Sequence, residues 1–141
     1  MADELQTKLV TTLTSLRDKG RTPTQAVEQI IQALGGHYQD VHRISVLNAT
    51  LISDVLYSVY QEALSPQELT ILLRNMGYEP QDIALAMHTS FATLNAQAIG
   101  ALLLDAQVYP QTEKQEIHLA LRFARFPAPE CDRAVAALYP A

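Results

Sequence analysis

The amino-acid sequence predicts an all-α fold. The expected form is a right-handed stack of short helices, about three three-helix units arranged like an α-solenoid, or a compact helical bundle. Three observations predict this class. Leucines recur at spacings of three and four residues, which is typical of amphipathic helices. Proline-led capping patterns precede several apolar stripes. No segment alternates apolar and polar residues over the length of a strand.

The first expected helix covers residues 3–19. Its apolar stripe consists of Leu5, Leu9, Leu13 and Leu16. Gly20 follows the stripe, and glycine readily takes the left-handed conformation that ends many helices. The sequence therefore predicts that the first helix stops just before this glycine.

A capping box predicts the second helix, over residues 23–34. Thr22 is placed to cap it, with Pro23 at the first helical position and Gln25 three residues after the cap. A short third helix is expected near residues 38–46. Five prolines are interpreted in this way as helix starts: Pro23, Pro66, Pro80, Pro110 and Pro129.

Internal similarity indicates repeated units. The segments "LNATLISDVL" from Leu47 and "LNAQAIGALL" from Leu94 lie 47 residues apart, and Asn48 and Asn95 would cap equivalent helices. A second pair of segments, "LTILLRNMGYEP" and "IHLALRFARFPAP", aligns at a shift of 48 residues, and "LTSLRDKGRTP" repeats the same motif near the N-terminus. We interpret the chain as one helical domain made of residues 1–47, 48–94 and 95–141. Its later helices are expected near residues 48–63, 66–76, 80–91, 95–107, 111–124 and 129–138.

The composition limits the classes of partner. The net charge is −5, and only 18% of the residues are charged, so strong attraction to nucleic acid or to an anionic membrane is not expected. A protein partner would be neutral or basic. No apolar stretch has the length of a membrane span.

The single cysteine, Cys131, favours a reducing compartment, and the acidic N-terminus does not resemble a signal peptide. We therefore expect a cytoplasmic protein. Cys131 would begin the last helix, where the helix dipole can activate a thiol. Glu130 and Asp132 oppose a thiolate, so burial as a small apolar side chain is the favoured interpretation.

No pattern indicates catalysis or metal binding. The sequence contains no phosphate-binding glycine loop, nucleophile elbow or HExxH motif. His37 and His42 lie five residues apart, which does not put both imidazoles on one helical face, and no second cluster completes a tetrahedral site. His88 and His118 stand alone. We expect no enzyme activity, no cofactor and no metal.

One segment resembles the helix-turn-helix of sigma factors and response-regulator activators. The matching residues are Ile83, Ala84, Met87, Ser90, Thr93 and Leu94. The resemblance implies a recognition helix over residues 91–102. However, no lysine or arginine occurs between Arg74 and Lys114, and DNA readers need cations to neutralise phosphates. Direct binding to nucleic acid is therefore not the favoured interpretation of this segment.

Two arginine-aromatic pairs are the main candidates for partner contacts. Arg74 with Tyr78, and Arg122 with Phe126, lie where one expected helix ends and the next begins. Exposed pairs would form a repeated ridge of residue types that are enriched in binding hot spots. Alternatively, each aromatic packs as a hydrophobic staple and each arginine offsets a helix dipole. This packed arrangement is the favoured interpretation.

Tyr57 and Tyr60, three residues apart, would lie either at the edge of the core or on a contact surface.

The candidate residues indicate binding of a partner and no turnover of a substrate. The sequence thus predicts a helical-repeat protein that binds another protein as an adaptor, an assembly factor or a regulator. Its apolar last helix is expected to self-associate or to be covered by a partner. The alternatives are a transcriptional regulator that uses residues 83–102, and a carrier of an apolar small molecule.

Overall fold

The computed structural model describes residues 2–33 and 48–140, and it confirms the all-α class. These residues form eight α-helices and no strand. The helices are α1 (Ala2–Asp18), α2 (Pro23–Ala33), α3 (Ala49–Tyr60), α4 (Pro66–Asn75), α5 (Pro80–Ser90), α6 (Ala96–Leu103), α7 (Lys114–Phe123) and α8 (Ala128–Leu138). A short 3-10 helix, Gln61–Ala63, extends α3. The short helix expected at 38–46, together with His37 and His42, lies outside the described residues.

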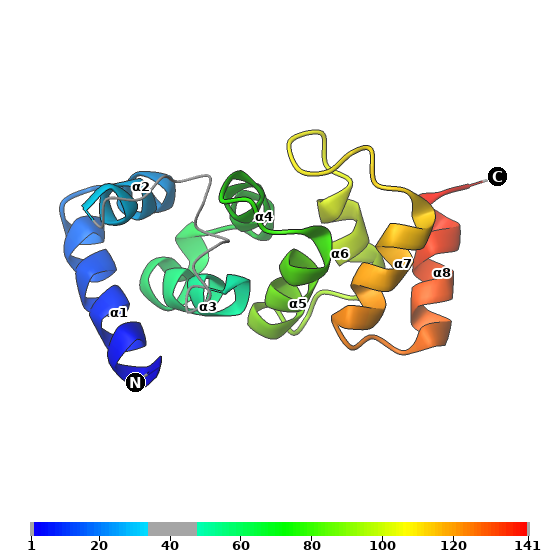
Figure 1. Cartoon of the computed structure of the whole chain (residues 1–141), viewed down its shortest axis with the longest axis horizontal. Helices are drawn as coiled ribbons and strands as arrows, with labels where there is room; N and C mark the ends of the chain where they lie inside the picture. Colours follow the sequence, from blue (N-terminus) through cyan, green and yellow to red (C-terminus); the bar gives the residue numbers. More distant parts are fainter. Residues whose placement is uncertain (1, 34–47, 141) are drawn as a thin grey trace.

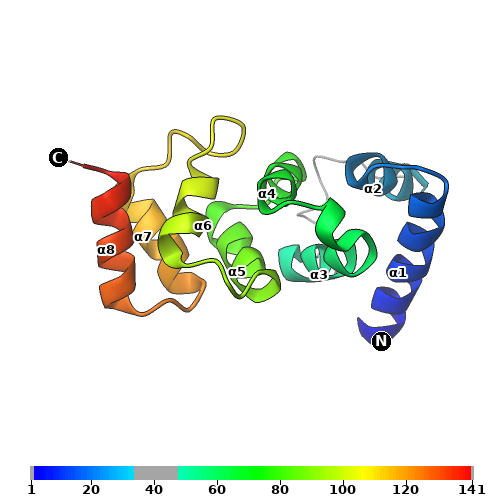
Figure 2. The same ribbon diagram turned by 180° about the vertical axis from the view of Figure 1, so that it is seen from behind.

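The helices form an elongated stack, with α1 and α2 at one end and α7 and α8 at the other (Figure 1). Helix α3 packs between α1 and α5, and α5 in turn packs on α7. Helix α8 packs on α6 and α7 and closes the far end of the stack, as the view from behind also shows (Figure 2). Segments that are close in sequence are therefore also neighbours in space.

Asn48 and Asn95 occupy equivalent positions. The side-chain oxygen of Asn48 accepts a hydrogen bond of 2.8 Å from the amide of Leu51, and that of Asn95 accepts one of 2.8 Å from the amide of Ala98. These bonds satisfy amides that the first turn of a helix leaves without a partner. The capped helices also pack alike, since α3 contacts α5 and α6 contacts α8.

The predicted capping patterns explain most of the other helix starts. Thr22 and Gln25 form the reciprocal box, with bonds of 3.0 and 3.2 Å between the amide of each residue and the side chain of the other. The hydroxyl of Ser65 accepts from the amide of Glu68 at the start of α4. Prolines stand in the first turn of α5 and α8 as expected.

The helix start expected at Pro110 is wrong. Helix α6 ends at Leu103, earlier than expected, and α7 begins only at Lys114. The intervening residues form turns instead, because the amide of Tyr109 bonds back to the carbonyl of Leu103 and the amide of Thr112 bonds to the carbonyl of Tyr109. A proline can begin a turn as well as a helix, and here the turn residues have partners elsewhere in the fold.

The core is continuous along the stack, and its largest fully buried side chains are those of leucine, isoleucine and methionine. The largest side chains that are fully buried are Leu13, Leu56, Leu64, Leu69, Leu72, Leu73, Met76, Ile83, Met87, Ile99, Leu103 and Ile117. Burial of one such side chain stabilises a fold by roughly 1.5 to 3 kcal/mol, so these contacts dominate the stability of the stack.

Candidate partner-binding site

Three helix ends share one backbone geometry. The turns after α1, α4 and α7 each contain a residue with positive φ, namely Gly20 (83°), Gly77 (96°) and Arg125 (79°). In each turn the amide that follows this residue bonds to a carbonyl five residues earlier. The bonds are Arg21 to Leu16 (3.0 Å), Tyr78 to Leu73 (3.3 Å) and Phe126 to Leu121 (3.2 Å). This is the Schellman ending of a helix, and it places Arg17, Arg74 and Arg122 at the same position of their helices.

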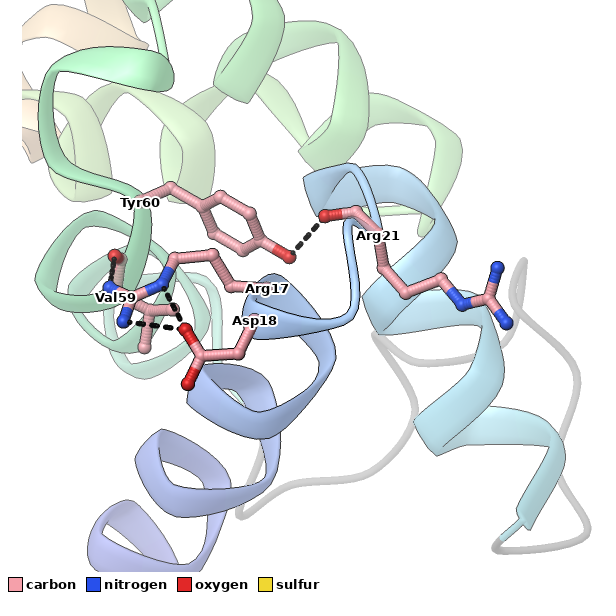
Figure 3. A network of polar contacts seen from close by, with 5 residues as sticks. All are labelled: Arg17, Asp18, Arg21, Val59 and Tyr60. Atoms are coloured by element: carbon pink, nitrogen blue, oxygen red, sulfur yellow. Dashed lines mark hydrogen bonds and ion pairs between the residues drawn. The ribbon is translucent and has the colours of Figure 1, made fainter.

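The first turn is held by a pair of hydrogen bonds from the end of α3 (Figure 3). The Nη1 of Arg17 donates to the carbonyl of Val59 at 2.8 Å. The hydroxyl of Tyr60 donates to the carbonyl of Arg21 at 2.9 Å. We call this arrangement a tyrosine clasp, because an arginine and a turn carbonyl hold a consecutive valine and tyrosine.

The second turn carries the same clasp. The Nε of Arg74 donates to the carbonyl of Val108 at 3.0 Å, and the hydroxyl of Tyr109 donates to the carbonyl of Tyr78 at 2.6 Å. The Arg74 guanidinium also lies 5.1 Å from the centre of the Tyr109 ring, within the range of a cation–π contact. The loop after α6 is thereby fixed onto the turn between α4 and α5.

Burial sets the ionisation of both clasp tyrosines. It raises the pKa of Tyr60 and of Tyr109 above 10.0, although the neighbouring arginine, Arg17 or Arg74, partly opposes the shift. The hydroxyls therefore stay protonated near neutral pH, so they can act as donors to the turn carbonyls.

The third turn has no tyrosine clasp among the described residues. Within residues 2–33 and 48–140, the carbonyl of Phe126 accepts a side-chain hydrogen bond only from the thiol of Cys131, at 3.6 Å, and Arg122 makes no hydrogen bond or ion pair. The turn itself is well anchored from the other side. His88 stacks on the Phe126 ring, with centres 4.0 Å apart, and its Nδ1–H donates to the carbonyl of Ala124 at 2.7 Å.

The helix before this turn exposes large apolar side chains. Leu119 is 66% exposed and Phe123 is 46% exposed, whereas Ile117, Ala120, Leu121 and Ala124 of the same helix are buried. Arg122 and Gln115 are exposed beside them. We call this surface the α7 face, and it consists of Gln115, Leu119, Arg122 and Phe123.

Two of the corresponding residues of α4 bond to the segment that follows α6. With Leu73 aligned to Leu121, the α7 face corresponds to Gln67, Ile71, Arg74 and Asn75. The amide of Gln67 donates to the carboxylate of Asp105 at 2.9 Å, and Arg74 holds Val108. Both partners come from the loop that follows α6, which therefore lies against α4, although Gln67, Arg74 and Asn75 stay exposed there and Ile71 is half-buried.

Two grooves, one beside α4 and one beside α7, differ in the segments that line them. A groove of about 320 Å³ lies beside α4, lined by Ile71 and by Thr24 at the start of α2, and Gln107 from the loop after α6 forms one of its walls. A groove of about 650 Å³ lies beside α7, lined by Leu119 and by Gln81 at the start of α5. Thr24 and Gln81 are at equivalent places, one residue after the first proline of their helices. The loop at residues 108–112, which precedes α7, also lines the second groove, and no described residue after α8 does so.

The predicted site residues divide between core and surface. Tyr78 (3% exposed) and Phe126 (6% exposed) are buried, so the exposed arginine-aromatic ridge does not form. Tyr60 and Arg74 belong to the clasps. Tyr57 is exposed and packs edge to face on Phe91, with ring centres 5.0 Å apart.

Sequence analysis missed Leu119 and Phe123. A signal was present, because both lie off the apolar stripe that begins at Ile117, and they are four residues apart on one face of the helix. Two large apolar residues at that spacing on the solvent side are unusual in a single amphipathic helix.

The residues that resemble a helix-turn-helix lie on α5, on α6 and in the turn between them. Helix α6 packs on α5, α7 and α8, and its exposed residues are Gln97 and Ala101. Asn95 is engaged as the cap of this helix. The outer side of α6 therefore offers no cation for a phosphate contact.

The described residues contain no group of three or more histidine, cysteine, aspartate or glutamate side chains that could hold a metal ion. Cys131 is fully buried, and burial, aided by Glu130 and Asp132, raises the pKa of its thiol despite the nearby Arg122. A buried thiol of this kind is a poor nucleophile. His118 pairs with Asp132 on the surface at 2.9 Å.

No helix in the described part of the chain is long and apolar enough to cross a membrane. Comparisons with protein-family models, with curated proteins and with solved structures find no match.

Proposed function

We propose that this chain is a non-catalytic helical-repeat protein that binds another protein, as an adaptor, an assembly factor or a regulator. The α7 face is its binding surface. The observation that carries the proposal is the exposure of Leu119 and Phe123 on this face, at positions whose counterparts on α4 adjoin the segment that follows α6. Exposed apolar side chains that cluster beside an arginine are typical of protein interfaces.

The repeat organisation is supported by the recurring turns and clasps. Stacked helical units bury their apolar surfaces on one another, and the surface of a unit that no neighbour covers is available to a partner. The exposed residues of α8 are Pro129, Asp132, Arg133, Ala136 and Ala137, and none of them is a large apolar residue. For this reason we place partner binding on α7 and not on the last helix, where the sequence had suggested self-association.

A non-catalytic role is supported by the state of the reactive side chains. The thiol of Cys131 is buried with a raised pKa, and His118 is engaged with Asp132. The net charge of −5 favours a neutral or basic partner over nucleic acid. We also propose a cytoplasmic location, because the single free cysteine suits a reducing compartment.

The test is a quantitative capture from the native extract with three baits. These are the wild-type chain, the double variant Leu119→Ser with Phe123→Ser, and the control Ala137→Ser on the exposed side of α8. Because all three positions are exposed, each variant should keep the helical content and the thermal midpoint of the wild type. We expect the wild type and the control to retain the same protein in stoichiometric amount, and the double variant to lose it.

Two outcomes would overturn the proposal. Equal capture by the double variant would remove the α7 face from the binding surface. The failure of all baits to retain any protein in stoichiometric amount would count against a binding role.

A further inference from the structure

We propose that the α7 face receives the end of a helix from another polypeptide, and that this helix carries an apolar residue followed by a tyrosine at or just after its last turn. The inference rests on the proposed function, because it specifies the partner of the same surface. It is drawn from the two clasps inside the chain.

Both internal clasps are filled by a valine followed by a tyrosine. Val59 and Tyr60 are the last two residues of α3, and Val108 and Tyr109 lie in the turns that follow α6. In each case the valine carbonyl accepts from the arginine, and the tyrosine hydroxyl donates to the turn carbonyl. A helix end suits an arginine chemically, because its last carbonyls lack partners within the helix and carry the negative end of the dipole.

The third turn presents the same groups without that segment. Arg122 offers the guanidinium donors, and the carbonyl of Phe126 accepts one hydrogen bond of 3.6 Å from the Cys131 thiol, which leaves its second lone pair for a tyrosine hydroxyl. Gln115 stands where Gln67 donates to the carboxylate of Asp105. A partner for all three groups would offer a free carbonyl to Arg122 and a tyrosine hydroxyl to the carbonyl of Phe126. It would also offer an acceptor side chain to Gln115, about one helical turn before that tyrosine.

The contact geometry of α4 also predicts which apolar atoms the partner covers. Leu119 corresponds to Ile71, which lines the smaller groove together with Gln107 of the covering segment. Leu119 lines the larger groove, whose lining includes the loop at residues 108–112 and no described residue after α8. A helix end seated on Arg122 would reduce the exposure of Leu119 and Phe123.

A second copy of this chain is a poor source of the covering helix. The tyrosines that follow an apolar residue at the described helix ends are Tyr60, Tyr109 and Tyr139. All three use their hydroxyls internally, on the carbonyls of Arg21, Tyr78 and Thr112. Tyr57, in the last turn of α3, also follows an apolar residue and is exposed, but its ring packs edge to face on Phe91. A second copy would have to break one of its own clasps, and a different polypeptide would not.

The experiment supplies the proposed helix end as a tethered probe. Residues 94–110 of the chain are appended after Ala141, so that the probe follows α8 with the spacing that α6 has after α5. The helix-ending residues Phe91 and Tyr139 have nearly the same backbone angles, φ −124° and −125°, which keeps the register. Tethering raises the effective concentration of the probe at the α7 face, so that a weak contact between them becomes measurable.

The measurement is amide hydrogen exchange of residues 119–126, compared among three extended chains. The first carries the natural probe, the second has Tyr109→Phe in the appended copy only, and the third has Val108→Ala with Tyr109→Ala in that copy. We expect the natural probe to slow exchange, the phenylalanine probe to lose about fivefold of that protection, which corresponds to one hydrogen bond, and the alanine probe to give none. Arg122→Met in the main chain should likewise abolish the protection.

The outcomes separate this inference from the proposed function. If the natural probe gives no more protection than the alanine probe, the proposed partner chemistry is wrong, whereas capture through Leu119 and Phe123 would still stand. If the natural probe protects, the extended chain should also stop capturing the natural partner, and continued capture would place the partner elsewhere on the chain. Self-association of the wild type that the probe disrupts would identify a second copy as the occupant and overturn the commitment to another polypeptide.

Discussion

The hydroxyl of Tyr109 donates a hydrogen bond of 2.6 Å to the backbone carbonyl of Tyr78, and so fixes the loop after α6 onto the turn between α4 and α5. Tyr60 makes the same bond, of 2.9 Å, to the carbonyl of Arg21. Each of these carbonyls lies just past the end of a helix, outside its hydrogen-bond ladder. The clasps thus join neighbouring helical units through groups that helix termini leave free.

Removing one clasp hydroxyl should weaken the stack without changing its shape. We expect Tyr109→Phe to lower the free energy of unfolding by about 1 kcal/mol, because the ring is kept and one partly buried hydrogen bond is lost. Urea denaturation measures the change. The control is Tyr57→Phe, whose hydroxyl has no hydrogen bond to a described residue and which should change stability by less than about 0.5 kcal/mol. Equal effects of the two variants would show that the clasp hydroxyl does not stabilise the fold.

Alkaline pH should destabilise the protein through the same tyrosines. Burial raises the pKa of Tyr60 and of Tyr109 above the ordinary value of 10.0, so the folded state favours the protonated phenols. Their contribution to stability is complete below pH 10.0 and is lost as the pH rises through the higher values of the folded state. Urea midpoints at increasing pH should therefore fall above that point. The fall should be smaller in Tyr109→Phe, and an equally steep fall in that variant would exclude Tyr109 as a cause.

The turn after α7 should gain stability from a glycine. Arg125 has a φ of 79°, and the equivalent residues, Gly20 and Gly77, are glycines with similar angles. A side chain in this left-handed region costs roughly 1 to 2 kcal/mol. We therefore expect Arg125→Gly to raise the free energy of unfolding by about 1 kcal/mol and Gly77→Ala to lower it by a similar amount. Thermal or urea unfolding of both variants measures this, and a loss of stability in Arg125→Gly would contradict the equivalence of the turns.

Arg74 should stabilise the fold, whereas Arg122 should stabilise the complex with the partner. Arg74→Met should lower the free energy of unfolding by about 1 kcal/mol, since it removes the donor to Val108 and the contact with the Tyr109 ring. Arg122→Met should change it by less than about 0.5 kcal/mol, because Arg122 makes no hydrogen bond to a described residue. It should instead weaken partner capture. Similar losses of stability in both variants would mean that the third turn is already clasped.

The thiol of Cys131 should be unreactive in the folded protein. The side chain is fully buried, and burial raises its pKa, so both access and thiolate content are low. Reaction with a disulfide reagent at mildly alkaline pH should be on the order of a hundredfold slower in the native chain than in urea. Rapid native labelling would restore a reactive role for this cysteine.

The sequence predicts the fold class and most helix starts because these depend on local chemistry. Asn48 and Asn95 cap their helices as expected, since a side-chain oxygen reaches an amide three residues on without any tertiary contact. Pro110 was misread because its surroundings are set by Tyr109, whose partner lies 31 residues away. No local pattern contains that information.

The candidate site could be predicted only in part for the same reason. The sequence marks Arg74 and Arg122 as equivalent, but their difference depends on whether a distant segment bonds to them. For Tyr78 and Phe126 the sequence leaves both exposure and burial open, with burial as a staple favoured, and the structure buries both rings. Leu119 and Phe123 stand out only after the buried side of α7 is known.

The most direct test of the account is site-specific photo-crosslinking in the native cells. A benzoylphenylalanine is placed at Phe123 on the α7 face, and in a matched protein at Ala101, an exposed position on α6. The account predicts a crosslink to another polypeptide from position 123 and none from position 101. The absence of a crosslink at 123, or equal crosslinking from both positions, would contradict it.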